Sequence, residues 1–259
     1  MSFSLKERCE PFKFRRERVV LKVSRYQNIV ILTGAGISAE SGLSTFRGAG
    51  SLWDGHRVQD VATPEAFARD PDLVHEFYNM RRSNLLKVKP NAAHDALSRL
   101  EKRHNGSVQI ITQNVDDLHK RSGSKNVLHM HGEILKARCR NCHKIFDWKK
   151  DLTEETTCPT CQTTPSLRPH IVWFGEMPLK MEEIEVALYT ADLFLSIGTS
   201  GNVYPAAGFV AEIKNMGKAH SVELNLEPSE GQFLFAEGIY GKATKIVPEF
   251  VETLLKENP

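Results

Sequence analysis

Four cysteines stand at spacings that suit a metal site. Cys139 and Cys142 form one C-x2-C pair, Cys158 and Cys161 form a second, and a fifth cysteine, Cys9, stands alone. Each pair turns two thiolates toward one point, and four thiolates fill the tetrahedral coordination of Zn²⁺. A redox or disulfide role is the alternative, but it is more typical of small secreted proteins. The spacing therefore predicts one structural Zn²⁺ with no position left for a substrate.

A glycine-rich turn follows the first apolar run of the chain. The run covers residues 26–32, and the turn at 34–39 fits the pattern G-x-G-x-x-G/A. Between a strand and a helix, such a turn lets the backbone approach a pyrophosphate. A dehydrogenase would also place an acid at the end of a second strand, about 20 residues further on. Asp54 has this spacing but lies in a loop at 51–55. The pattern therefore favours nucleotide binding over hydride transfer, with a plain structural turn as the alternative.

Short polar side chains or bare backbone follow three more apolar runs. The carboxyl ends of parallel strands are where a dinucleotide would lie. Each group taken alone is as consistent with turn chemistry, but together they indicate one site. The groups are Gln113, Asn114 and Asp116 after 108–112, Gly198, Thr199 and Ser200 after 193–197, and Asn225 and Glu227 around the end of 221–226.

Two histidines, His129 and His131, stand at the end of the run 126–130. Histidine is the side chain whose ordinary pKa suits a general base near neutral pH. On a strand, residues two apart share a face, so both rings would point the same way. Residue chemistry alone does not choose between them.

These features must be positioned by alternating strands and helices. The expected strands are 26–32, 108–112, 126–130, 193–197 and 221–226. The expected helices are 38–42, 74–86, 92–103, 116–122, 181–190, 205–216 and 248–256. This alternation predicts the α/β class, with a Rossmann-like, doubly wound parallel sheet.

Two stretches break this rhythm and are expected to be insertions. Residues 46–91 look loop-rich and then helical, without a strand, and residues 133–176 carry the cysteine pairs. We expect both to form a smaller helical and zinc-binding domain, with the ligand cleft between it and the core. The expected core comprises 26–45, 92–132 and 177–259, and residues 1–25 form an N-terminal extension.

Composition limits the function classes. The chain has 259 residues, 41% hydrophobic residues and a formal net charge of +2, which makes no case for nucleic acid. It contains no apolar run of about 18 residues, so no membrane span is expected. The basic N-terminal stretch is interleaved with acids and lacks the apolar centre of a signal peptide. We therefore expect a cytoplasmic protein.

Taken together, the motifs resemble the sirtuins, the family of NAD-dependent protein deacylases, in order and spacing over about residues 26–250. Within that family the chain is most similar to the bacterial CobB type, while residues 1–25 fall outside the resemblance. The motifs are the segments 34–42, 45–48, 112–116, His131-Gly132, the four paired cysteines, 168–170, 172–176, 198–200 and 202–207.

The resemblance implies a role for each matching residue. His131 would be the base that deprotonates a ribose hydroxyl, Asn114 and Asp116 would line the nicotinamide pocket, and Gln113 would contact the ribose. Phe46 would cover the released nicotinamide, with Arg47 beside it. The remaining NAD contacts would be Gly34, Ala35, Gly36, Ser38, Glu40, Gly198, Thr199, Ser200, Asn225, Glu227 and Ala243.

Tyr78 and Arg81 lie three residues apart on an expected helix and so share a face. A phenol and a guanidinium there could clamp a carboxylate, although arginines on helices are usually solvated. The resemblance implies that they bind malonyl and succinyl groups, and that Ala62 widens the acyl pocket. It also implies that Val172, Trp173 and Phe174 bind substrate as an added strand, whereas from the residues alone a buried apolar run is preferred.

The expected function is therefore deacylation of protein lysines, both deacetylation and desuccinylation or demalonylation. NAD would be the co-substrate, Zn²⁺ would be structural, and nicotinamide and O-acyl-ADP-ribose would be released. Substrates would be acylated proteins bound as extended peptides, with acyl-CoA synthetases and other metabolic enzymes expected by the resemblance; neither nucleic acid nor a membrane is needed. An NAD-dependent dehydrogenase and a non-catalytic nucleotide-binding zinc protein are the alternatives.

Overall fold

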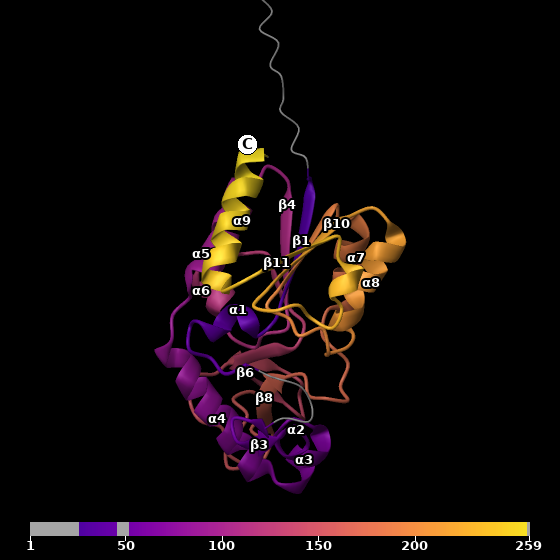
Figure 1. The fold of residues 1–259 in the computed structure, drawn as a ribbon. Coiled ribbons are helices and arrows are strands. Elements are labelled where there is room, and N and C mark those ends of the chain that lie inside the picture. Colours follow the sequence, from indigo (N-terminus) through magenta and orange to yellow (C-terminus); the bar gives the residue numbers. More distant parts are fainter. Residues whose placement is uncertain (1–25, 46–51, 258–259) are drawn as a thin grey trace, which may run out of the picture.

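The computed structural model describes residues 26–45 and 52–257, and in this part of the chain six parallel strands form the main sheet (Figure 1). Their order is β11-β10-β9-β1-β4-β5, so the chain winds outward from β1 on one side and from β9 on the other. A crevice is expected at the carboxyl ends of β1 and β9, where the winding reverses. The strands are β1 (Asn28–Thr33), β4 (Ser107–Thr112), β5 (Val127–His129), β9 (Leu193–Ile197), β10 (His220–Asn225) and β11 (Glu237–Tyr240).

Helices cover both faces of this sheet, and β1 shows why. Alternate side chains of a strand point to opposite faces. Ile29 and Ile31 enter the core beneath α5 and α9, whereas Val30 and Leu32 enter the core beneath α7 and α8. The helices of this region are α1 (Gly36–Ala39), α5 (Ala92–Arg103), α6 (Leu118–Arg121), α7 (Met181–Thr190), α8 (Phe209–Met216) and α9 (Ala243–Glu257), with 3-10 turns η1 (Ala206–Gly208) and η2 (Gln232–Leu234).

The two insertions pack together below the carboxyl ends of the sheet (Figure 1). Their shared core contains Phe77 from the first insertion and Ile134 and Ile171 from the second. An N-cap residue and a proline start the helix 64–69: Thr63 accepts a hydrogen bond from the Ala66 amide, and Pro64 is the first helical residue. The elements are β2 (Leu52–Trp53), β3 (His56–Arg57), α2 (Val58–Val61), α3 (Pro64–Arg69), α4 (Pro71–Lys87), β6 (Gly132–Cys139), β7 (Ile145–Asp147) and β8 (Leu167–Ile171).

The sequence predicted five of the main strands and the two helices α5 and α7 with their bounds. It missed β11, an edge strand that contains Gly238 and is largely exposed, so no apolar run marks it. The first insertion was wrongly predicted to lack strands, because β2 and β3 form a short hairpin. Helix α1 begins two residues before the predicted start, and α9 begins at Ala243 and continues through Pro248.

Within the described residues, no helix combines the length and the apolar character that crossing a membrane requires.

Candidate active site

The glycine turn after β1 lies against the loop after β9, at the point where the sheet reverses. The Gly36 amide donates to the Gly198 carbonyl at 2.9 Å, and Gly198 has a φ of +64°. A Cβ on Gly36 would lie 2.7 Å from the Gly198 Cα, and a Cβ on Gly198 would lie 2.4 Å from the Ile37 nitrogen. The glycines are therefore needed to bring two loops of the protein together, in addition to any approach of a ligand.

A cavity of about 730 Å³ opens at this edge and extends to the small domain. Its walls bring together most of the predicted site residues, from both regions of the chain. They are Gly34, Ala35, Gly36, Ser38, Ala62, Tyr78, Arg81, Gln113, Asn114, Asp116, His131, Val172, Trp173, Phe174, Gly198, Thr199, Ser200, Asn225 and Glu227.

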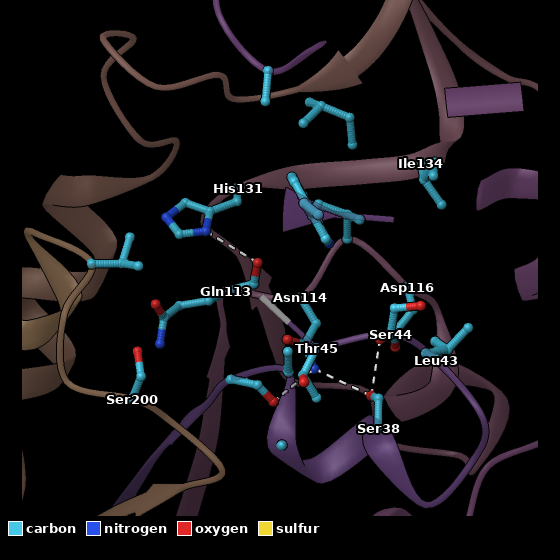
Figure 2. A pocket seen from close by; sticks show the side chains of 18 of the residues that line it. Ser38, Leu43, Ser44, Thr45, Gln113, Asn114, Asp116, His131, Ile134 and Ser200 are labelled. Atoms are coloured by element: carbon cyan, nitrogen blue, oxygen red, sulfur yellow. Dashed lines mark hydrogen bonds between the residues drawn. The ribbon is translucent and has the colours of Figure 1, made fainter. Parts of the chain in front are cut away.

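Ser38 links two polar side chains from the end of β4 (Figure 2). Its hydroxyl donates to Asp116 Oδ2 at 2.9 Å and accepts from Asn114 Nδ2 at 3.2 Å. Asn114 Nδ2 also donates to the Gly34 carbonyl at 3.0 Å, which ties the end of β4 to the glycine turn. Burial raises the pKa of Asp116, opposed by hydrogen bonds from the Leu118 amide and Ser38. The side chains at this edge are thus fixed by one another.

The structure separates the two histidines that residue chemistry alone left equivalent. His129 ends β5, is 5% exposed and does not line the cavity. His131 lies beyond the strand, in the turn before β6, and lines the cavity, so the two do not act from one strand face. Its Nδ1 is 3.1 Å from the Gln113 carbonyl, which can only accept (Figure 2). The proton is therefore on Nδ1, and Nε2 is left as the basic atom.

Residues 172–174 follow β8 and line the cavity, and their amides are already bonded. The Val172 amide donates to the His131 carbonyl at 2.9 Å and the Phe174 amide to the Ala62 carbonyl at 3.0 Å. The Trp173 amide donates to Glu176 Oε2 at 2.8 Å. A peptide added beside this segment would thus find no free amide, and the Trp173 carbonyl also accepts a hydrogen bond, from the Glu176 amide at 3.0 Å. Trp173 is buried but Phe174 is 38% exposed, so the segment is not simply a buried apolar run.

Tyr78 and Arg81 both face the cavity from α4. The Tyr78 hydroxyl accepts a hydrogen bond from Trp173 Nε1 at 3.1 Å, and burial raises the pKa of Tyr78 to about 12. The Arg81 guanidinium lies over the Trp53 ring, 4.2 Å from its centroid, and donates to Asp54 Oδ2. The sequence therefore missed a carboxylate at this site. The dipeptide Asp54-Gly55 is a hairpin-turn signal that could have placed it at the tip of β2 and β3.

The four paired cysteines converge as predicted, and their geometry fits Zn²⁺. Their Sγ atoms all lie within 4.8 Å of one another. Cys139 and Cys161, like Cys142 and Cys158, are 3.7 Å apart at sulfur, whereas a disulfide requires about 2.05 Å. Four thiolates at about 2.3 Å from one ion would be about 3.8 Å apart. None of the four lines the cavity, so the metal would be structural.

Two of the predicted NAD contacts in the described part of the chain, Glu40 and Ala243, do not line the cavity. Phe46 and Arg47 lie outside the described residues. Glu40 is exposed, and its carboxylate accepts from the amide and hydroxyl of Thr244 at the start of α9, while Ala243 packs against the sheet core. Conversely, several cavity residues had not been predicted as site residues, because they are apolar or lie in turns: Leu43, Ser44, Thr45, Trp53, Asp54, Ile134, Val203 and Tyr204.

The site and the sheet define a dinucleotide-binding α/β protein, and comparisons with known proteins give its family. Residues 34–205 match the model of the Sir2 family. The chain is 56% identical over 254 residues to the NAD-dependent protein deacylase of Escherichia coli (strain K12), covering 97% of this chain and 91% of the relative. It is 58% identical over 232 residues to the deacylase of the same description from Vibrio vulnificus (strain YJ016), covering 89% and 94%.

Solved structures agree with this result. A Sir2 homolog in complex with NAD is 36% identical with a TM-score of 0.83, covering 91% of this chain and 92% of that one. A Sir2 protein bound to acetylated peptide is 27% identical with a TM-score of 0.76, covering 88% and 94%.

This chain belongs to the Sir2 family, the sirtuins. The predicted family, the Rossmann-like fold and the pairing of NAD with a zinc-binding cysteine cluster are confirmed. The predicted extent of the resemblance, about residues 26–250, was too short. The Escherichia coli match covers 97% of the chain, so the similarity extends into residues 1–25.

Proposed function

We propose that this chain removes acyl groups from lysine side chains of proteins in a reaction that consumes NAD. It is a sirtuin-type enzyme, as its family and its relatives establish. The observation that carries the proposed mechanism is the placement of His131, Asn114 and Asp116 in one cavity with the glycine turn. A dehydrogenase is disfavoured because Asp54, the acid at the required spacing, lies in the β2–β3 hairpin and is paired with Arg81.

The residues at the carboxyl edge of the sheet fit a dinucleotide. When bound, NAD would supply the ribose carbon that the acyl oxygen attacks and the nicotinamide that leaves. The loops at 34–36 and 198–200 would hold the pyrophosphate and ribose, and Asn225 and Glu227 would lie beside them. Among the described residues, both side-chain hydrogen bonds of Asn114 use its nitrogen, so its oxygen can accept from a carboxamide. By the family resemblance, Phe46 would cover the nicotinamide, with Arg47 beside it.

His131 would act as the general base. Its Nδ1–H donates to the Gln113 carbonyl, which fixes the ring and leaves Nε2 to take a proton from a ribose hydroxyl. Burial lowers the pKa of His131 below its ordinary value of 6.5, opposed by the bond to Gln113. The ring is therefore neutral, and ready to accept a proton, at neutral pH.

The acyl group would lie toward α4, where both neutral and acidic chains can be accommodated. Ala62 is small and buried at the wall, and Tyr78 and Arg81 present a phenol and a guanidinium to the cavity. A carboxylate of malonyl or succinyl lysine can bind to both, whereas acetyl lysine needs neither. We propose deacetylation together with desuccinylation and demalonylation as the activities.

Substrates would be acylated proteins that present the lysine on an extended segment beside residues 172–174. We propose acyl-CoA synthetases and other metabolic enzymes as targets, because the relatives are bacterial deacylases, and the cytoplasm as the compartment. Neither nucleic acid nor a membrane is required by the mechanism.

Free nicotinamide is the decisive product. The chain is incubated with NAD and an acetylated peptide, and nicotinamide and the deacylated peptide are quantified together. We expect one nicotinamide per acyl group removed. Formation of reduced NAD would support a dehydrogenase instead, and the absence of both products would leave a nucleotide-binding protein.

A further inference from the structure

The carboxylate of Asp54 stands where the proposed mechanism places the carboxylate of an acidic acyl group. Arg81 NH1 donates to Asp54 Oδ2, and both side chains line the cavity. They are 15% and 18% exposed, so neither is freely solvated. The protein itself thus supplies a carboxylate, that of Asp54, which forms an ion pair with Arg81.

The local fold holds Asp54 in this place. The hairpin pairs Trp53 with His56, and Asp54 and Gly55 form its two-residue turn with φ values of +49° and +86°. Two positive φ angles are typical of the tight turn that joins such strands. The hairpin packs on α4 through edge contacts of Trp53 and His56 with the Phe77 ring, at centroid distances of 5.5 and 5.7 Å. The turn carboxylate is therefore held against α4, one turn of helix from Phe77.

Asp54 has a different consequence for each class of acyl group. An acetyl group is neutral and leaves the Arg81–Asp54 pair intact, so Arg81 presents no unpaired charge to it. A malonyl or succinyl group brings a second carboxylate to one guanidinium, and two carboxylates at one site repel each other. The acidic group must displace Asp54 or share Arg81 with it.

We propose that Asp54 is a specificity-determining residue: a built-in carboxylate that competes with malonyl and succinyl groups for Arg81 and shifts the enzyme toward neutral acyl groups. This inference rests on the proposed deacylase function and adds to it the residue that sets the balance between acyl classes. The opposite role, in which Asp54 only orients Arg81 for substrate, predicts the opposite result on substitution.

The test is Asp54→Asn, which removes the charge while keeping a residue that tolerates positive φ. The kcat/KM values for succinylated and acetylated forms of one peptide are measured, together with the Kd of each peptide without NAD. We expect the succinyl-to-acetyl ratio to rise by at least about fivefold, within the coupling range of groups in contact. A ratio that stays constant or falls would overturn the proposal.

Two controls separate this role from a structural one. In an Arg81→Met background, Asp54→Asn should no longer change the ratio, whereas a change of equal size would show that Asp54 does not act through Arg81. Asp60→Asn removes a carboxylate of the same domain that pairs with Arg57 and Arg69 outside the cavity, and should leave the ratio as it is. If wild type turns over neither peptide, the proposed function fails, and the Kd ratios still decide the role of Asp54.

Discussion

The two ends of the cavity are built on different principles. At the sheet end, Ser38, Asn114 and Asp116 are bonded to one another, and His131 is bonded to a backbone carbonyl. At the helix end, which comprises Trp53, Asp54, Tyr78 and Arg81, the charge of Arg81 is met by a carboxylate that a ligand can replace. The first arrangement suits groups that the proposed reaction uses with every substrate, and the second leaves a hydrogen bond that an acidic acyl group could exchange.

The two ends also depend on different parts of the chain. The residues of the sheet end are positioned by the ends of the strands and by the contact of Gly36 with Gly198 between the loops after β1 and β9. The helix end depends on the zinc-bearing insertion, because Asn79 of α4 exchanges hydrogen bonds with the backbone of Leu152 at 2.8 and 2.9 Å. Arg82 also donates to the Ile134 carbonyl at 3.0 Å. The metal site should therefore affect the helix end more directly.

The largest effect is expected from loss of the metal. Structural Zn²⁺ contributes an apparent binding free energy of about 10–16 kcal/mol in zinc-finger peptides. Cys158→Ser should lose the ion and lower both the melting temperature and the activity, with peptide binding weakened more than NAD binding. Metal content, Tm and the Kd values for NAD and acetyl peptide are the measurements. A folded, metal-free variant with full activity would show that the module is dispensable.

Substitution of His131 at the sheet end should abolish turnover of substrates with every kind of acyl group. His131→Ala deletes the proposed base, which typically contributes 10²- to 10⁴-fold, while NAD should still bind. His129→Ala is the matched control, because this ring lies outside the cavity, and it should retain most activity. Single-turnover rates with acetyl and succinyl peptides measure both. Equal losses from the two substitutions would leave His131 without support as the base.

The pH profile offers a second measurement of the same residue. The pKa of His131 is lowered by burial from its ordinary value of 6.5. In the proposed mechanism the neutral ring is the active form. Activity should therefore persist as pH falls below 6.5 and decline only below the lowered pKa. An acid limb of kcat/KM above pH 6.5 would contradict this environment for the base.

The sheet end was largely readable from sequence, and the helix end only in part, because Tyr78 and Arg81 were predicted to share a helix face but Asp54 was not predicted beside them. Asn114 and Asp116 follow a predicted strand, and parallel strands bring their carboxyl ends to one edge, so the pattern itself implies proximity. Asp54 reaches Arg81 only through the packing of the six-residue hairpin 52–57 on α4, which no periodicity encodes. Residue chemistry alone did not choose between His129 and His131; the resemblance selected His131, and the position of each ring relative to the cavity depends on where β5 ends. What the sequence did not provide was which distant residues come into contact, as Asp54 and Arg81 do; the residue types themselves were known.

The helix end should discriminate between acyl groups rather than support the reaction. A hydrogen bond to a charged group is worth about 1.5–3 kcal/mol, or roughly 10- to 150-fold. Arg81→Met should cut kcat/KM for a succinyl peptide by at least about tenfold and change that for the acetyl peptide only a few-fold. The measurement is the ratio of the two values in variant and wild type. Equal losses would mean that Arg81 supports the helix or the cavity wall.

Tyr78→Phe should change the same ratio by a smaller factor. The Tyr78 hydroxyl accepts from Trp173 Nε1, and burial raises the pKa of Tyr78 to about 12, so at neutral pH it keeps a proton to donate to an acyl carboxylate. A neutral donor contributes less than a guanidinium, about 0.5–1.5 kcal/mol, or roughly two- to twelvefold.

The same substitution leaves the buried Trp173 N–H without its acceptor, a cost of about 1–3 kcal/mol in the stability of the fold. This loss should affect both substrates equally, because Trp173 belongs to the segment that we propose lies beside the peptide. Absolute rates therefore do not isolate the contact of Tyr78 with the acyl carboxylate. The ratio of the two kcat/KM values isolates that contact. Denaturant unfolding of Tyr78→Phe measures the loss of fold stability separately. A ratio unchanged from wild type would assign Tyr78 to the support of Trp173 alone, and Arg81 would then be the carboxylate ligand without it.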